Sequence, residues 1–465
     1  MKKQKRDRVN GFREAKAGSF IVLILFIAII AGVVFVYNAP MFEREMAKID
    51  VKTNGYWNLR DPLNIDISDA SGVKSYSVIA LKGDERIKLA SESFAVAQEG
   101  VTLAISAPKR LYALKDKNVQ LHIEVTDGSK WNFMAGNSIS ADVKLKIDKK
   151  KPRVSIITNS YAIRKGGSAL IIFKAEDPNL DELYIETNFG KKFKPQPFYK
   201  EGYYISLVAW PVMEPKFKAT VIATDSAGNI GRAHIPLRLR SKEYRTSKIN
   251  LSDKFLEGKI AELAEEFQET AGIKDSVEQF KTINETVREN NEKVIHEITS
   301  KVSTEMLTTF AIRPFYPLKN AAVVARFGDH RLYYYNNEQI SESYHLGLDL
   351  ASVKMGKIKV PSPSTVVFAQ DNGIYGNMPV LLHGLGLYTI YGHCSSINVH
   401  EGDQVGTNAH IANTGMSGYA MGDHLHFGVL VQGIEVRPEE WMDKQWIRLN
   451  VTDVIKNAKK IVKRQ

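Results

Sequence analysis

The chain has 465 residues, of which 44% are hydrophobic and 25% charged, and its formal net charge is +11. A single cysteine excludes an internal disulfide, so folding must depend on hydrophobic cores, and the length leaves room for about three domains. The mild basic excess suits an anionic polymer or lipid head groups as surroundings. Nucleic acid is not an expected partner, because the sequence has no nucleic-acid-binding motif and no concentrated basic face.

The N-terminus predicts a membrane anchor. Residues 2–16 contain seven lysine or arginine residues against two acidic ones, and an uncharged apolar run from Phe20 to Tyr37 follows. With the two residues before it, this run has about the 20 residues that a helix needs to span a bilayer. Tyr37 also stands where a signal peptidase site needs a small residue. We expect a cytoplasmic basic tail at 1–17, an uncleaved transmembrane anchor at 18–38, and the rest of the chain outside that membrane.

Residues 50 to 240 are predicted to form strands, because short runs of alternating apolar and polar residues are separated by turn residues. The basic segment Lys149–Pro152 divides this region, and we expect two immunoglobulin-like β-sandwiches, at 48–148 and 152–240. Ala223–Asn229 is similar to the last-hairpin turn of bacterial immunoglobulin-like domains. We interpret both domains as spacers rather than binding modules, because no aromatic cluster marks a ligand face. The clearest strands expected in the first domain are Leu63–Ile67, Val73–Leu81, Val119–Val125 and Val143–Ile147.

Residues 241–309 change to a helical pattern. Leu256, Ile260 and Leu263 step by four and three, which places them on one face of a helix. Gly272 is expected to separate two helices. The simplest interpretation is a connector whose apolar stripe packs on the domain that follows.

Five groups in the last third of the chain have the composition of a zinc-hydrolase site: His345, Asp349, His393, His424 and His426. Zinc takes imidazole and carboxylate ligands, and a catalytic site keeps three protein ligands and an open position for water. Two histidines and one aspartate satisfy that count and leave two histidines to handle protons. His424 and His426 share one face of a predicted strand, so one can bind metal while the other reaches water or substrate.

The residues around the first of these groups predict a bent strand. Leu346 and Leu348 alternate with His345, Gly347 and Asp349, so the leucines should face a core and the polar set a cleft. A straight strand would separate the Cα atoms of His345 and Asp349 by roughly 13 Å, which is too far for two ligands of one ion. We therefore expect a bend or bulge near Gly347, where glycine removes the steric penalty.

Further motifs accompany these groups in order: Phe327-Gly328 with Arg331, HLGLD, YGN, HGLGLYTIYGH, EGDQV, NTGMSG and GDHLHF. With them, residues from about 327 to 441 resemble the lysostaphin/LytM-type zinc peptidases of the cell wall. The resemblance covers about a quarter of the chain and implies a small antiparallel β domain, which we place at 310–445. One departure is a longer turn over Ser417–Met421, which we expect to shape the cleft without touching a ligand.

The resemblance also implies a role for each of the five groups. His345, Asp349 and His426 would bind zinc, and His393 and His424 would be the catalytic pair. Such a metal centre lowers the pKa of bound water toward about 7 and polarises the scissile carbonyl. A neutral His424 would accept the water proton and later protonate the leaving amine, whereas His393 would donate to the developing oxyanion.

Other catalytic motifs are excluded. His296 and His400 each precede a glutamate as in HExxH, but Ser300 and Gln404 stand where the second histidine belongs. Cys394 is expected to pack in a core, because the metal set is already complete without a cysteine nucleophile. The remaining histidines are expected to be structural or surface residues: His122, His234, His330, His383 and His410.

The sequence therefore predicts a mainly β protein with a transmembrane helix, two sandwiches, a helical linker, a peptidase domain and a short basic C-terminal helix at 446–465. Its expected function is zinc-dependent hydrolysis of peptide cross-links or stem peptides of peptidoglycan, as an endopeptidase or a carboxypeptidase. We expect a single-pass protein of a Gram-negative inner membrane with its catalytic domain in the periplasm. Its expected partners are peptidoglycan, that membrane and regulatory envelope proteins.

Two further hypotheses accompany this prediction. The alternative function is a non-catalytic LytM-type scaffold that binds and activates another cell-wall hydrolase. The presence of all five site residues favours the enzyme. The second hypothesis is that the helical pair within 241–309 lies across the zinc cleft and restrains activity until a partner moves it, because an unrestrained wall hydrolase would endanger its own cell.

Overall fold

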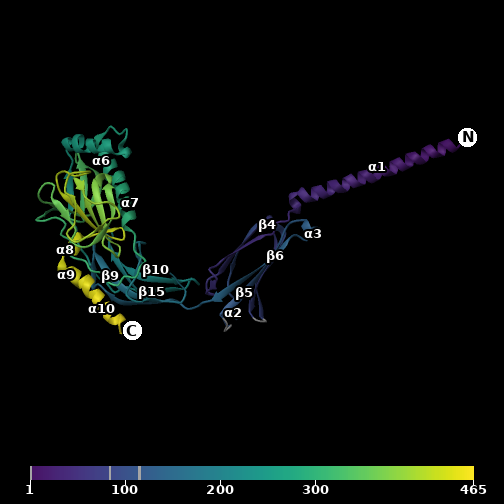
Figure 1. Ribbon diagram of the computed structural model, residues 1–465, viewed down its shortest axis with the longest axis horizontal. Coiled ribbons are helices and arrows are strands. Elements are labelled where there is room, and N and C mark those ends of the chain that lie inside the picture. Colours follow the sequence, from purple (N-terminus) through teal and green to yellow (C-terminus); the bar gives the residue numbers. More distant parts are fainter. Residues whose placement is uncertain (1–2, 83–84, 114–116, 465) are drawn as a thin grey trace. The chain divides into compact units, whose positions relative to one another are not determined.

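The structure is a computed structural model that describes residues 3–82, 85–113 and 117–464 (Figure 1). The chain divides into two compact units. The first unit contains Met1–Lys150 and Ser226–Asn229, and the second contains Lys151–Asp225 and Ile230–Gln465. We describe each unit by itself.

The first unit begins with one long helix, α1 (Lys3–Asn38). Its segment Phe20–Asn38 is 19 residues long and apolar, and none of its residues is buried. A helix of this length and composition fits a membrane anchor or a signal sequence, so the predicted apolar helix is confirmed, whereas its orientation across a membrane stays a prediction.

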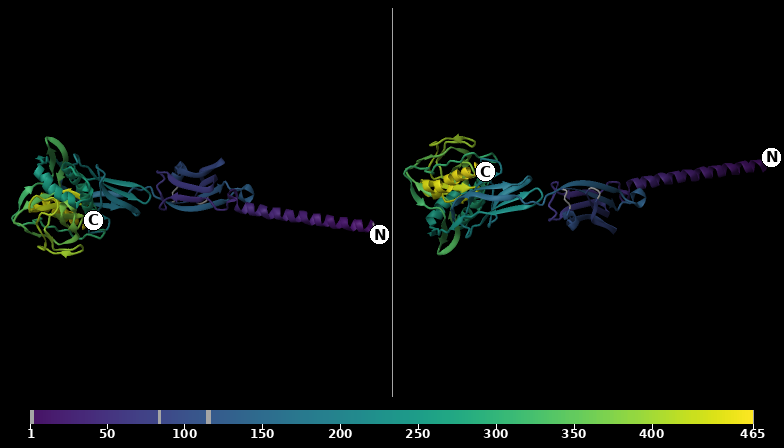
Figure 2. Two further views of the ribbon diagram at one scale, coloured as in Figure 1. Left: turned by 90° about the horizontal axis from the view of Figure 1, so that it is seen from above. Right: turned by 90° about the horizontal axis from the view of Figure 1, so that it is seen from below.

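The rest of the first unit is one six-stranded sheet, in the order β1-β3-β5-β6-β2 with β4 paired to β3 (Figure 2). The immunoglobulin-like sandwich expected here is not confirmed. Leu63–Ile67 and Val73–Leu81, which were expected as separate strands, form one 20-residue strand, β3, that continues through Gly72. The neighbouring strand β4 pairs with β3 on both sides of that glycine. The elements are η1 (Pro40–Phe42), β1 (Lys48–Lys52), β2 (Tyr56–Trp57), β3 (Leu63–Lys82), β4 (Glu85–Ile105), α2 (Lys109–Ala113), β5 (Asn118–Asp127), α3 (Trp131–Met134) and β6 (Ser138–Ile147).

The second unit begins with two four-stranded sheets, ordered β12-β13-β9-β7 and β11-β10-β14-β15, and a small parallel pair, β8 and β16. Buried side chains of both larger sheets, such as Leu207 and Val221, belong to one hydrophobic core. The expected hairpin turn is confirmed between β14 and β15, whereas an immunoglobulin-like topology is not. The strands are β7 (Arg153–Asn159), β8 (Ala162–Arg164), β9 (Ser168–Glu176), β10 (Leu180–Thr187), β11 (Lys192–Phe193), β12 (Gln196–Pro197), β13 (Tyr203–Ala209), β14 (Ala219–Asp225), β15 (Ile230–His234) and β16 (Arg238–Arg240).

The segment predicted to be helical, 241–309, is helical only between residues 253 and 299. Its first part forms a strand, β17 (Thr246–Asn250), because it pairs in parallel with a strand of the peptidase domain. Gly272 separates the helices as expected, with a φ of +82°. The helical elements are α4 (Asp253–Phe255), η2 (Leu256–Ile260), α5 (Ala261–Glu266), η3 (Gln268–Thr270), α6 (Ser276–Thr282), η4 (Ile283–Val287) and α7 (Arg288–Thr299).

The apolar stripe of these helices packs on the C-terminal β domain. Leu256, Ile260 and Leu263 are buried in one cluster with Ile374 and Met378 of that domain. Figure 1 shows α6 and α7 beside its green strands. The helical segment is therefore built into the same folded unit as the predicted peptidase domain.

The C-terminal domain contains an eight-stranded sheet ordered β18-β21-β29-β25-β24-β23-β27, with β30 on β29. Two three-stranded sheets complete it, β17-β19-β20 and β22-β28-β26. Its elements are β18 (Ala322–Ala325), β19 (Asp329–Tyr335), β20 (Glu338–His345), β21 (Leu348–Ala351), β22 (Lys357–Lys359), β23 (Ser364–Asp371), η5 (Gly373–Tyr375), β24 (Asn377–Leu382), β25 (Leu387–Gly392), β26 (Ser396–Ile397), β27 (Gln404–Val405), β28 (His410–Asn413), β29 (Leu425–Val431) and β30 (Ile434–Val436).

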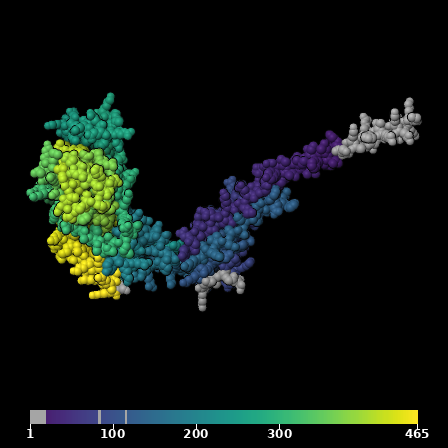
Figure 3. All heavy atoms as spheres, viewed as in Figure 1, coloured from purple at the N-terminus to yellow at the C-terminus, as the bar shows by residue number. Residues whose placement is uncertain are grey.

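The chain ends in helices that pack back on the β-rich start of this unit (Figure 3, yellow). The predicted basic helix is confirmed, and its apolar face, including Val454 and Ala458, is buried. The Thr158 hydroxyl donates a hydrogen bond of 3.2 Å to the backbone carbonyl of Val454. The helical elements are α8 (Pro438–Met442), α9 (Lys444–Ile447), η6 (Arg448–Thr452) and α10 (Asp453–Val462).

Candidate active site

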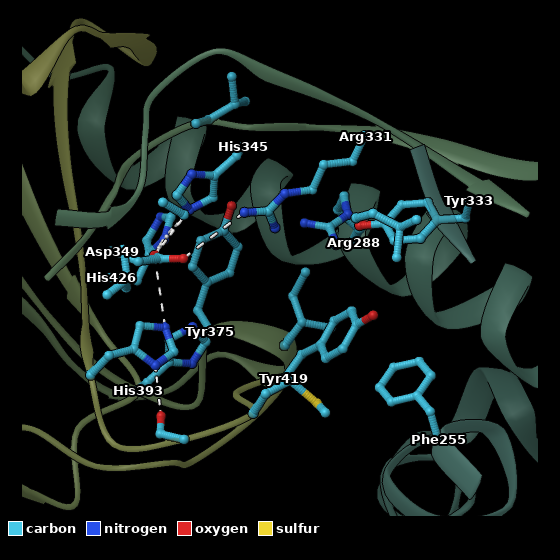
Figure 4. Close-up of a pocket in the computed structure, with 18 of the residues that line it drawn as sticks. Phe255, Arg288, Arg331, Tyr333, His345, Asp349, Tyr375, His393, Tyr419 and His426 are labelled. Carbon is cyan, nitrogen blue, oxygen red and sulfur yellow. Dashed lines mark hydrogen bonds and ion pairs between the residues drawn. The ribbon is translucent and has the colours of Figure 1, made fainter. Parts of the chain in front are cut away.

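Three neighbouring elements bring His345, Asp349 and His426 together. His345 ends β20, Asp349 lies in β21, and the register of β21 against β29 places Asp349 directly opposite His426. Asp349 Oδ1 lies 2.9 Å from both His345 Nε2 and His426 Nδ1, and the two ring nitrogens are 3.2 Å apart (Figure 4). The residues that the sequence analysis proposed as metal ligands therefore form one compact group.

The expected bend lies between His345 and Leu348, where β20 ends and β21 begins. A Cβ atom at Gly347 would lie 2.5 Å from His426 Nε2, which is closer than real Cβ contacts. Glycine is needed here because the imidazole passes directly over the backbone. Leu346 and Leu348 are buried, as their alternation with the polar residues predicted.

The hydrogen bonds of this group suit it to hold a cation. His345 Nδ1 lies 2.9 Å from the backbone carbonyl of Arg326 and donates to it, so Nε2 of the neutral ring is a lone-pair acceptor. In this tautomer the lone pair faces a carboxylate oxygen of Asp349, and a cation between the two acceptors would stabilise the contact. The ligand atoms of a tetrahedral zinc site lie roughly 3.3 Å apart, close to the separations found here. His345, Asp349 and His426 therefore fit zinc.

The electrostatics of the buried group favour a charged Asp349 and a neutral His426. Burial alone would raise the pKa of Asp349, but the close contacts with the His345 and His426 rings outweigh burial and hold that pKa well below its usual range. Burial lowers the pKa of His426 and lowers the pKa of His393 to about 3. A carboxylate with neutral imidazoles is the donor set that a divalent metal ion prefers.

His393 and His424 lie beside the three clustered residues. His393 directly follows β25 and has a φ of +64°, an uncommon conformation for a residue other than glycine. Its Nδ1 donates to the backbone carbonyl of Ser417 over 2.9 Å, and His424 Nδ1 donates to that of Gly422 over 2.7 Å. His424 Nε2 is 3.7 Å from Asp349 Oδ1. With Nδ1 as the donor, the neutral form of each ring has its lone pair at Nε2.

A cavity of about 680 Å³ opens beside all five residues, and the helical segment that was hypothesised to lie across the cleft contributes side chains to it that the sequence did not single out. Leu251, Ser252 and Phe255 come from the segment before and within α4, and Arg288 begins α7. Their positions carry no catalytic motif, so local spacing gave no signal for them. The helical segment therefore forms part of the cleft, and whether it restrains activity stays a prediction.

The long turn Ser417–Met421 shapes the cleft, as expected. Tyr419 and Met421 line the cavity, and the Tyr419 ring stacks on Phe255 with centroids 6.2 Å apart and planes at 28°. The turn touches none of the three clustered residues directly, but its Ser417 carbonyl orients His393. The turn thus contacts both Phe255 on the helical wall of the cleft and His393.

The side chains assigned to other roles lie outside the cavity lining. His296 pairs with Glu435 over 2.7 Å, and His383 is buried against Thr389, where burial lowers its pKa to about 3. The Cys394 thiol is buried and donates to the Tyr391 carbonyl. His122, His330 and His400 also pair with carboxylates, and His410 with Asn413.

Comparison with known proteins agrees with this geometry. The family model described as peptidase family M23 matches residues 343–438, which include all five site residues. These residues form an M23 (LytM-type) peptidase domain. Members of M23 are generally zinc metallopeptidases, which agrees with the donor set of the cluster.

Some relatives of the M23 domain are named as peptidases, and one is named as a sporulation protein. Stage II sporulation protein Q of Bacillus subtilis is 34% identical over 115 residues, which are 24% of this chain and 39% of that protein. DD-carboxypeptidase/endopeptidase Mpg of Neisseria meningitidis is 30% identical over 94 residues, which are 20% of this chain and 22% of that protein. The solved catalytic domain of lysostaphin from Staphylococcus simulans is 25% identical, with a TM-score of 0.23, and the match covers 26% of this chain and 92% of that domain.

Proposed function

We propose that the protein is a zinc-dependent peptidase that hydrolyses peptide cross-links or stem peptides of peptidoglycan. The observation that carries the proposal is the meeting of His345 Nε2, Asp349 Oδ1 and His426 Nδ1, with a second pair of imidazoles beside them. The names of relatives such as DD-carboxypeptidase/endopeptidase Mpg support peptidoglycan as the substrate.

In the proposed mechanism His345, Asp349 and His426 hold zinc, which when bound supplies a Lewis acid that acidifies water and polarises the scissile carbonyl. His424 accepts the proton of the attacking water at Nε2 and returns it to the leaving amine. The expected hydrogen bond from His393 to the oxyanion is disfavoured in this structure. Nδ1 already donates to Ser417, so His393 could donate from Nε2 only when protonated, and burial disfavours that form.

We propose that α1 anchors the protein in the inner membrane and that the catalytic domain works in the periplasm. The apolar stretch Phe20–Asn38 and the basic residues before it support this orientation. The β-rich segments 48–148 and 152–240 would then act as spacers between the membrane and the peptidoglycan. Regulatory envelope proteins would be further partners.

Digestion of isolated sacculi with the full chain in detergent tests the proposal. We expect soluble muropeptides to be released, and a chelator followed by added zinc should abolish and then restore that release. The chemistry of the new ends in the fragments identifies the bond that is cut. Intact sacculi together with a protein that binds no zinc would overturn the proposal.

The second candidate is a non-catalytic scaffold that activates another hydrolase. One observation favours it, because the relative that is 34% identical is named as a sporulation protein rather than as a peptidase. The complete set of five residues favours the enzyme. A scaffold would leave purified sacculi intact but would raise the rate of a second hydrolase added to them.

A further inference from the structure

Two arginines from different elements enter the cleft. Arg331 lies in β19 and Arg288 begins α7, and both line the same cavity as His345 and Asp349. Figure 4 shows the Arg331 guanidinium directed toward Asp349, with the Arg288 side chain beside it in this view. Arg288 lies outside the residues that match the M23 family model.

Arg331 is held beside the proposed metal ligands by two carboxylates. Its Nε is 3.6 Å from Asp329 Oδ2, and its Nη2 is 4.0 Å from Asp349 Oδ2. The second distance is at the limit of an ion pair. Arg331 therefore has a fixed position next to the reacting centre and keeps donors free to bind another group.

Arg288 is oriented by amide groups alone. Its Nε donates to the Asn284 carbonyl over 3.1 Å, and its Nη2 donates to Asn284 Oδ1 over 3.0 Å. Asn284 is buried, and its own amide donates to Ser341 Oγ of β20 over 2.8 Å. Within the described part of the chain, no carboxylate forms an ion pair with this half-buried guanidinium. A charge held rigidly in a pocket by neutral groups, without an ion-paired carboxylate, is suited to bind an anion.

The acidic residues of the cavity cannot supply that anion. The carboxylates in its lining are those of Asp349 and Asp423. Asp349 faces two imidazoles, and Asp423 accepts hydrogen bonds from the Met355 amide and the Thr414 hydroxyl. Outside the lining, Arg288 also interacts electrostatically with Glu292 of α7, but among the described lining residues no carboxylate is paired with the Arg288 guanidinium.

We propose that Arg288 and Arg331 bind a carboxylate of the peptide substrate next to the scissile bond. This inference rests on the proposed peptidase function and adds a substrate class, namely peptides with a carboxylate near the bond that is cut. A guanidinium pair binds such a group through charge-assisted, bidentate hydrogen bonds. The carboxylate is either the free C-terminus of a stem peptide or an acidic side chain beside a cross-link.

Binding of three matched peptides to the full chain in detergent tests the proposal. All three are N-acetylated: the first has a free C-terminal carboxylate and neutral side chains, the second is its C-terminal amide, and the third is the amide with one acidic side chain. The His393→Ala background prevents turnover while calorimetry measures Kd. We expect at least one carboxylate peptide to bind roughly tenfold or more tightly than the neutral amide.

The variant Arg288→Gln should remove the preference for carboxylate peptides and leave binding of the neutral amide unchanged. The variant Arg288→Lys, which keeps the charge, should retain part of the preference. Lys293→Gln removes the same charge from an exposed position of α7 and should have no effect. A preference for the first peptide identifies the C-terminal carboxylate as the ligand, and a preference for the third identifies the side chain.

Three results would overturn the inference. These are an equal loss of affinity for all three peptides in Arg288→Gln, an unchanged preference in that variant, and no measurable binding of any peptide by the parent protein. If the protein digests sacculi but binds the three peptides equally, the carboxylate subsite is wrong and the proposed peptidase function stands. If it prefers carboxylate peptides but does not digest sacculi, the proposed catalysis is wrong and the subsite stands.

Discussion

At the scale of single residues, the site works because hydrogen bonds decide which ring nitrogens carry protons. His345, His393 and His424 each donate from Nδ1 to a backbone carbonyl. Each ring is thereby fixed in the tautomer that directs a lone pair at Nε2 toward the cleft. Under the proposed mechanism, the same side-chain type would serve as a metal ligand in one position and as a proton carrier in another, depending on what lies opposite its free nitrogen.

Substitutions should separate these two roles. We expect His345→Ala and Asp349→Ala to lose zinc, because each removes one of three donors. His393→Ala should keep zinc and lose turnover by about 10²- to 10⁴-fold, the usual contribution of a group that handles protons or charge. Metal analysis of the purified variants and sacculus digestion measure the two properties. Loss of zinc in His393→Ala would contradict the division of roles.

Glu440 provides a pH-dependent contribution to stability away from the site. Burial raises its pKa to about 7, although the Ser168 amide donates to it over 3.1 Å. The unfolded chain releases this proton near its ordinary pKa of 4.5, so stability is fully present below that pH and is lost as pH rises to about 7. Glu440→Gln should therefore gain on the order of 3 kcal/mol relative to the parent between pH 4.5 and 7.5.

Chemical denaturation of both proteins at several pH values measures this difference. The comparison isolates Glu440, because every other titrating group is common to the two chains. Parallel pH profiles of the parent and Glu440→Gln would show that the carboxyl group is not held protonated by burial.

At the scale of secondary-structure elements, short local motifs were easier to predict than long-range pairing. The HLGLD and HLH pieces revealed both their strands and the bend at Gly347, because alternation and glycine sterics act within a few residues. The strand β17 was missed since five residues inside a helical region carry too little pattern, and its pairing with β19 is not encoded locally. Arg288 was missed for a similar reason, because a charged residue among other charged residues of a helix is typical of a solvent-exposed face.

The contact between Phe255 of α4 and Tyr419 is the element-scale feature that bears on restraint of the enzyme. If this stacked pair narrows the cleft, Phe255→Ala should raise the rate on sacculi several-fold, because an aromatic pair contributes about 0.5–1.5 kcal/mol. A short soluble peptide should be cut at nearly the parent rate. The measurement is the ratio of the two rates, with Val294→Ala on the exposed side of α7 as the control. An unchanged ratio would show that the Phe255–Tyr419 contact does not restrain the enzyme and that the helices act as structural supports.

At the scale of the whole molecule, the division into two units separates the proposed chemistry from the proposed anchoring. The second unit contains the site, the helical wall of the cleft and the β-rich segment on which the C-terminal helix packs. The sequence analysis treated these as separate domains, because composition shows where patterns change and does not show which cores merge. Their shared cores predict that they unfold together.

Calorimetry of the chain in detergent should therefore give two main transitions rather than one for each expected domain. The proposed zinc site lies wholly in the second unit, so removal of zinc should lower the Tm of one transition and leave the other unchanged. His345→Ala should reproduce the effect of the chelator and make the protein insensitive to added zinc. A single transition, or a shift of both by chelator, would show instead that the two units are coupled in stability, so that the metal site stabilises the anchoring part as well.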